Sequence, residues 1–182
     1  MLAYVFWHRP ATGVDRGSYE AGLGAFHAAL AAAPPPGFGG SCSLRVGPAP
    51  WLAGVGDAYE DWYLVASWAA LGELNAQAVS GPRADPHDAA AARAGAGVAG
   101  VYRLLAGAPA PPAQPHGAWL SKPAGTAYAE FHAALAGALP AGGCAWRRQM
   151  TLGPAGEYAV RAPEPVALPW PAAPVEALAV AG

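Results

Sequence analysis

Two histidines have the clearest potential for chemistry in this sequence, because each lies in a copy of the same pentapeptide. Phe-His-Ala-Ala-Leu occurs around His27 and again around His132. His27 lies on the flank of an apolar stripe that contains Leu23 and Leu30 at helical spacing, whereas His132 lies within its own stripe. A neutral imidazole at the edge of an apolar cavity can act as a general base or acid near neutral pH. The substrate for such a site is a flat, weakly acidic molecule such as a phenol, an enol or a β-keto compound.

A second interpretation stays open for both histidines. A helix histidine can instead bond to a neighbouring strand and fix the packing of its helix. Repetition favours this structural role, since the fold keeps a packing residue in both copies while a catalytic residue need survive in only one. If one of them is catalytic, we expect His27 to be the acid or base, because a flank position reaches a cavity mouth. His132 is then its structural twin and lines the substrate site.

Strand-type segments near these histidines add further candidates. Arg9 and Tyr63 could orient an oxyanion, and Trp7 and Trp62 could line a substrate pocket. The structural alternatives are a surface cap for Arg9 and core positions for the aromatic residues. His8 alternates with Trp7, so one of them faces the helices and the other faces the interior of the sheet, in an order that the sequence does not assign.

No pattern for a metal or a cofactor accompanies these candidates. No two histidines are spaced i, i+4, no His-x-His occurs, and no phosphate-binding or dinucleotide glycine pattern is present. Cys42 and Cys144 are too few for a disulfide framework and lack the Cys-x-x-Cys spacing of a zinc site. We therefore expect a site without metal or cofactor.

Composition narrows the class of protein. Of the 182 residues, 54% are hydrophobic and 12% are charged, with a net charge of −2. Such a chain can fill a core but lacks the clustered basic residues that nucleic acid requires. No apolar run approaches the length of a membrane span, and the N-terminal segment lacks the features of a signal peptide. The expectation is a cytoplasmic protein with no nucleic-acid or membrane partner.

The elements that must position the candidates follow the same order in both halves. The helix around His27 is expected to begin at the cap Ser18 and to stop at the prolines from Pro34. Strand 59–65 should place Tyr59, Asp61, Tyr63 and Val65 on one face. The first half then reads β-α-β-β-α-β, the ferredoxin-like order.

The second half repeats this order without its second helix. Residues 162–174 contain five prolines, which exclude a helix there. The predicted division is a first unit over 1–106, a proline-rich linker over 107–115, and a degenerate second unit over 116–182.

Short motifs in both halves resemble the EthD-like branch of the dimeric α+β barrel superfamily. A basic residue with proline precedes a helix that carries His-Ala-x-Leu, followed by proline, glycine and a strand. The matching residues are Arg9-Pro10, His27 to Leu30 and Pro36-Gly37, then Lys122-Pro123, His132 to Leu135, Pro140 and Gly142, with Trp62 and Ser67 in a strand that runs into a helix. The departures are the missing second helix and a displaced Gly13.

The resemblance implies the fold and the function that we expect. The fold is α+β, with two tandem ferredoxin-like units packed sheet to sheet as an intramolecular pseudo-dimeric barrel, which makes the chain a monomer. The function is a small cofactor-independent enzyme that uses histidine acid–base chemistry on an aromatic or polyketide-like molecule. Two alternatives remain open: a non-catalytic barrel that binds a small molecule or a protein, and a haem-binding barrel, since related barrels hold haem through a helix histidine.

Overall fold

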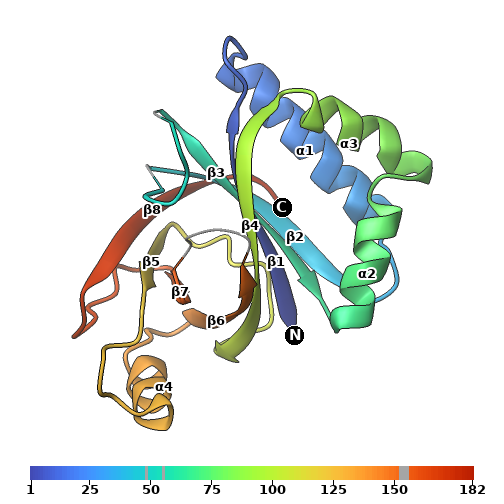
Figure 1. Ribbon diagram of the computed structural model, residues 1–182. Helices are drawn as coiled ribbons and strands as arrows, with labels where there is room; N and C mark the ends of the chain where they lie inside the picture. The colour runs from blue at the N-terminus through green and yellow to red at the C-terminus, as the bar shows by residue number, and fades with distance from the viewer. Residues whose placement is uncertain (48, 55, 152–155) are drawn as a thin grey trace.

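The computed structural model describes residues 1–47, 49–54, 56–151 and 156–182. The described chain forms a sheet of antiparallel strands with short helices outside it (Figure 1). The strands are β1 (Leu2–Pro10), β2 (Phe38–Val46), β3 (Ala58–Val65), β4 (Ala94–Ala106), β5 (His116–Leu120), β6 (Cys144–Thr151), β7 (Tyr158–Ala162) and β8 (Ala172–Ala181).

These strands close into one barrel in the order β1-β3-β2-β8-β5-β7-β6-β4. The predicted fold class, two ferredoxin-like units packed sheet to sheet as a dimeric α+β barrel, is wrong. The halves do not form two sheets that face each other. Strands of the two halves pair along their edges instead, β2 with β8 and β4 with β6. Edge pairing satisfies the backbone groups that an open sheet leaves exposed, and it makes a single, mostly β structure.

Both halves nevertheless contribute four strands in the same relative order, β4-β1-β3-β2 and β8-β5-β7-β6. The repeated pentapeptide therefore marks equivalent helices, one in each half. The domain boundaries at 106 and 116 stay a prediction, since one barrel contains strands from both sides of them.

Three helices of the first half cover one side of the barrel, and one helix of the second half lies at the other end of the molecule (Figure 1). They are α1 (Arg16–Ala32), α2 (Trp68–Gln77) and α3 (Ala84–Ala91), with α4 (Tyr128–Gly137) in the second half; a short 3-10 helix, Gly81–Arg83, precedes α3. Ser67 caps α2 as predicted. The cap of α1 is Asp15 rather than Ser18, because the Asp15 side chain accepts the Ser18 backbone N–H at 2.9 Å.

Both pentapeptide helices turn their apolar stripes to the core. Phe26, Leu30, Phe131 and Leu135 are all buried. The proline-rich stretch of the second half contains no helix, as expected. Its Trp170 lies against Phe131, with ring centroids 4.7 Å apart, so this coil covers α4 where the first half uses a helix.

The barrel interior is filled by aromatic residues. Trp7, Trp62, Trp119, Trp146 and Tyr102 belong to one buried cluster inside the strands. Several neighbouring rings meet at steep angles, as with Trp7 and Trp119 at 4.9 Å and 72°. Bulky rings thus close the lumen between the two halves.

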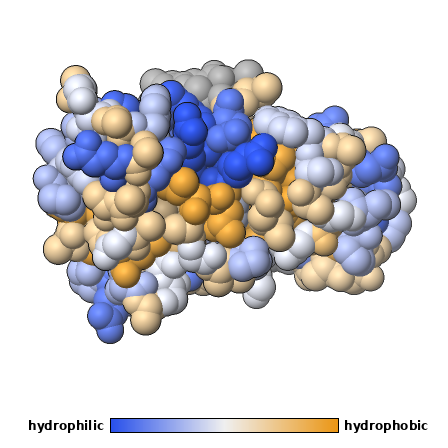
Figure 2. Space-filling view, turned by 90° about the horizontal axis from the view of Figure 1, so that it is seen from below, coloured by the Kyte–Doolittle hydropathy of each residue, from blue (hydrophilic) through white to orange (hydrophobic). Residues whose placement is uncertain are grey.

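Apolar residues also reach the surface. Figure 2 shows hydrophobic side chains gathered near the middle of one face, bordered by hydrophilic ones. Among the described helices, none has the length and apolar character that crossing a membrane requires.

Candidate functional site

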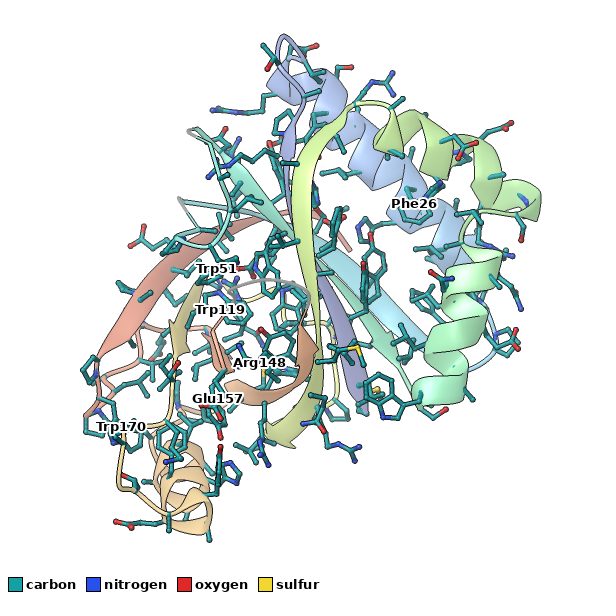
Figure 3. The ribbon with its side chains drawn as sticks, viewed as in Figure 1. Phe26, Trp51, Trp119, Arg148, Glu157 and Trp170 are labelled. Carbon is teal, nitrogen blue, oxygen red and sulfur yellow. The ribbon has the colours of Figure 1, made fainter. Side chains whose placement is uncertain are left out.

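A cavity of about 760 Å³ lies between the three helices of the first half and the outer face of β1, β3 and β4. Its walls are mostly apolar and aromatic. Phe26 of α1 extends into this region between helix and sheet (Figure 3). The cavity is within the size range of small-molecule sites, which are concave and mostly apolar with a few polar groups.

Alternation along β3 places polar side chains beneath the helices. Tyr59, Asp61 and Tyr63 lie on the outer face, as the sequence predicts, while Glu60 and Trp62 lie toward the lumen. The whole strand is buried. A carboxylate on the buried outer face of a strand is costly without polar partners, so its neighbours decide whether it can persist.

The carboxylate of Asp61 lies at the centre of a polar cluster. Its Oδ2 accepts a hydrogen bond from the Tyr63 hydroxyl at 3.0 Å. The same oxygen lies 3.1 Å from His8 Nε2 and 3.7 Å from His27 Nε2. These imidazole contacts have the proximity of ion pairs but not the direction of hydrogen bonds. The other oxygen, Oδ1, is buried and has no hydrogen-bond partner among the described residues.

In each imidazole the other ring nitrogen, Nδ1, contacts a hydroxyl group. His8 Nδ1 lies 2.5 Å from the Tyr19 hydroxyl, and His27 Nδ1 lies 2.7 Å from Ser41 Oγ. An ionised carboxylate can only accept, so a neutral imidazole in this position carries its proton on Nε2, the nitrogen nearer to Asp61. Nδ1 of His8 then accepts the Tyr19 O–H. Tyr19, His8 and Asp61 therefore form a continuous chain of polar contacts.

The cluster controls the ionisation of its members. Burial alone raises the pKa of Asp61, but the two imidazoles outweigh it and hold that pKa well below the ordinary value. Burial, and next the negative charge of Asp61, raise the pKa of Tyr63, Tyr19 and Tyr4. The carboxylate is therefore ionised at neutral pH, and the surrounding phenols stay protonated and able to donate.

Of the predicted site residues, the structure brings His27 and Tyr63 together. Their rings stack at 5.2 Å with an interplanar angle of 8°, and both contact Asp61. Tyr63 lines the cavity, whereas His27 does not. The predicted flank position of His27 thus leads to the cluster, although not to the cavity wall.

Arg9 does not join them. It lies at the end of β1 and donates to the carbonyl oxygens of Leu52, Ala53, Gly56 and Asp57, at 2.5–3.4 Å. It therefore fixes the backbone at these four residues. The alternative interpretation was a surface cap for the sheet, whereas Arg9 is buried and contacts a neighbouring loop.

Trp7 and Trp62 lie on the opposite side of the sheet from the cavity. Both are fully buried inside the barrel, near Trp51 and Trp119, which Figure 3 shows together within the strands. Trp62 Nε1 donates to Glu60 at 3.1 Å. As core residues of the lumen they do not line the site around Asp61.

His132 lies in the other half of the molecule. Its Nε2 is 3.0 Å from the Tyr158 hydroxyl, a helix-to-strand contact of the kind expected for a packing histidine. Burial, followed by the charge of Arg147, lowers its pKa. It is not among the residues that line the cavity near His27.

Sequence reasoning missed the roles of Asp61, His8 and Tyr19. Asp61 had a visible signal, since an aspartate between two tyrosines on the buried face of a strand needs a partner. The order of His8 and Trp7 was left open, and the structure turns His8 toward the helices. Tyr19 precedes Leu23 by one helical turn on α1, and only its contact with His8 gives its hydroxyl a role.

A second cavity of about 520 Å³ opens at one end of the barrel, against Trp51, Trp119 and Glu60. Glu60 is paired with Arg161 and accepts from Trp119 Nε1 at 3.0 Å, so its charge is already balanced. Within the described ranges, no group of three or more His, Cys, Asp or Glu side chains is arranged to hold a metal ion.

The chain matches no protein-family model and no curated protein. The geometry around Asp61 is therefore the main evidence for function.

Proposed function

We propose that the chain binds a flat, mostly apolar small molecule beneath α1, α2 and α3 and moves a proton on it without a cofactor. The observation that carries the proposal is the contact chain Tyr19–His8–Asp61 on the wall of the cavity. An aromatic or polyketide-like molecule with an acidic C–H or O–H has the shape and chemistry for such a site. The resemblance to EthD-like proteins and the cytoplasmic location stay proposals as well.

In the proposed mechanism His8 is the acid and base. Asp61 faces Nε2 of His8, fixes its tautomer and stabilises the imidazolium that forms when the ring takes a proton. Tyr19 lines the cavity and carries the proton between the substrate and Nδ1 of His8. When the hydroxyl passes its proton to the ring, it takes one from the substrate, so the phenol is restored.

Two further groups complete the arrangement. His27 Nε2 lies 3.7 Å from the same oxygen of Asp61, and His27 supports the carboxylate as a positioning residue. Tyr4 lines the cavity as a protonated phenol and is available to donate to an oxyanion that develops on the substrate. The expected acid or base thus shifts from His27 to His8, because His8 lies on the cavity wall.

Hydrogen–deuterium exchange on 2-tetralone tests this proposal, since this flat bicyclic ketone has acidic protons beside its carbonyl. NMR in D₂O should show exchange faster with the protein than in buffer alone. His8→Gln and Tyr19→Phe should each lower the protein-dependent rate by about 10²–10⁴-fold, the range of general acid–base catalysis. His27→Gln should lower it less.

His132→Gln is the matched control, because the same substitution then falls on the other pentapeptide histidine, outside the cavity. It should exchange the ketone at the wild-type rate. Wild-type rates in the His8 and Tyr19 variants, or no acceleration by the wild-type protein, would overturn the proposed proton transfer.

A further inference from the structure

The site also specifies the charge of its ligand. The cavity wall contains no lysine or arginine among the described residues. Its one acidic residue is Asp61, which is 3% exposed and ionised because its pKa is lowered. A ligand carboxylate or phosphate would leave water for an apolar wall with no lysine or arginine to pair with and lie beside the like charge of Asp61, which is costly.

The carboxylate needs one more partner. Oδ2 of Asp61 is engaged by Tyr63 and the two imidazoles, whereas Oδ1 is buried without a hydrogen bond. A buried acceptor left unpaired destabilises the folded protein. A hydroxyl or enol O–H of a ligand would supply the missing donor. A full positive charge is not required, since two imidazoles already lower the pKa of this carboxylate.

The mouth of the cavity has the opposite character. Trp68, Val79 and Met150 line it and are 45%, 51% and 53% exposed. Exposed apolar residues at a rim favour an apolar part of the ligand. The polar group of the ligand is therefore at the deep end, beside Asp61, and its apolar part is at the mouth.

We infer that the cavity selects uncharged ring compounds that carry a hydroxyl or enol donor for the Asp61 carboxylate, and rejects their carboxylate and phosphate counterparts. This inference rests on the proposed function, because it names the substrate class of the same site. It does not depend on proton transfer taking place.

Three naphthalene derivatives test it by titration at about pH 7, where a carboxylic acid is ionised. They are 2-naphthol, which has a donor; 2-methoxynaphthalene, which has none; and 2-naphthoate, an anion. Calorimetry should give a Kd for 2-naphthol about tenfold below that for 2-methoxynaphthalene, a factor that corresponds to one good hydrogen bond. The anion should bind more weakly than both.

Asp61→Asn should shrink both differences, because the amide is uncharged. Asp57→Asn should leave them unchanged, since Asp57 is partly exposed, pairs with Arg16 and does not line this cavity. The comparison of the three ligands on the wild-type protein stands alone if Asp61→Asn fails to fold.

The outcomes separate the two proposals. Equal binding of all three ligands, or preferred binding of 2-naphthoate, would overturn the ligand selection while leaving a small-molecule site in place. Retained selection in a folded Asp61→Asn variant would also overturn it. No binding of any of the three would overturn the site itself, and with it the proposed function.

Discussion

Glu60 and Asp61 are consecutive residues of β3, and their carboxylates lie on opposite sides of the barrel wall. Glu60 accepts from Trp119 inside the lumen and pairs with Arg161 of the second half. Asp61 contacts His8, His27 and Tyr63 beneath the helices. One strand thus has a structural ion pair on one face and the candidate site on the other, and both buried charges have polar neighbours as burial requires.

The lowered pKa of Asp61 predicts a loss of stability in acid. A carboxylate with a lowered pKa in the folded protein contributes stability that is complete above its unfolded pKa, about 4. That contribution is lost as the pH falls from there toward the folded pKa. Urea titrations over this acidic range should therefore show a shallower pH dependence for Asp61→Asn than for wild type.

Asp85→Asn makes the same chemical change at an exposed position of α3 and serves as the control. The attribution to Asp61 fails if the pH dependence of unfolding is the same in wild type and Asp61→Asn.

The lowered pKa of His132 predicts a second loss of stability on acidification, this time near neutral pH. Its pKa is lowered in the folded protein by burial and by Arg147, so the unfolded chain binds the proton more readily. The contribution of His132 to stability should be complete above about pH 6.5, its unfolded pKa, and should decline as the pH falls below that value. His132→Gln should flatten this part of the profile in denaturant titrations, and an unaltered profile would contradict the assignment.

The cysteines should be unreactive in the folded protein. Burial is the largest effect on the Cys42 thiol and raises its pKa to about 12, and burial raises the pKa of Cys144 as well. The thiolate is the reactive form, so neither residue should be alkylated by iodoacetamide in native buffer at about pH 8. Both should react after unfolding in urea. Rapid labelling of the native protein would show that the barrel opens at these positions.

Leu30 and Leu135 provide a matched pair of core truncations, one in each pentapeptide. Both are fully buried. Each substitution by alanine should reduce the free energy of unfolding by about 2–5 kcal/mol, the usual range for a buried leucine. Denaturant titration measures the loss. A value below about 0.5 kcal/mol would instead match an exposed position, contrary to the burial of these helices.

The sequence predicts the local features well, because they depend on near neighbours. Alternation places Tyr59, Asp61 and Tyr63 on one face, and Ser67 begins α2 as expected. Closure of the barrel depends on the pairing of β2 with β8 and of β4 with β6, between residues far apart in the chain. No local pattern specifies such pairing, so the arrangement of two facing sheets was expected in error.

The dependence on distant pairing also explains which residues of the candidate site could be predicted. His27 and Tyr63 were identified because a helix stripe and a strand stripe give the direction of a side chain. Arg9 lies at a strand end, where the partner is a distant segment whose carbonyl groups the sequence does not locate. Trp7 and His8 alternate on β1, and only the pairing of this strand decides which of them reaches the helices.

Closure of the sheet also limits how the molecule can associate with others. Each described strand has a hydrogen-bonded neighbour on both sides, so no strand lies wholly at an edge of the sheet. The two neighbours are staggered on β2, because β3 pairs with it from Phe38 and β8 only from Ser43. Addition of a strand from another chain is thus confined to short stretches of this kind. A larger assembly of the intact barrel is expected to form through side chains, on the helices, the loops or the outer faces of the strands.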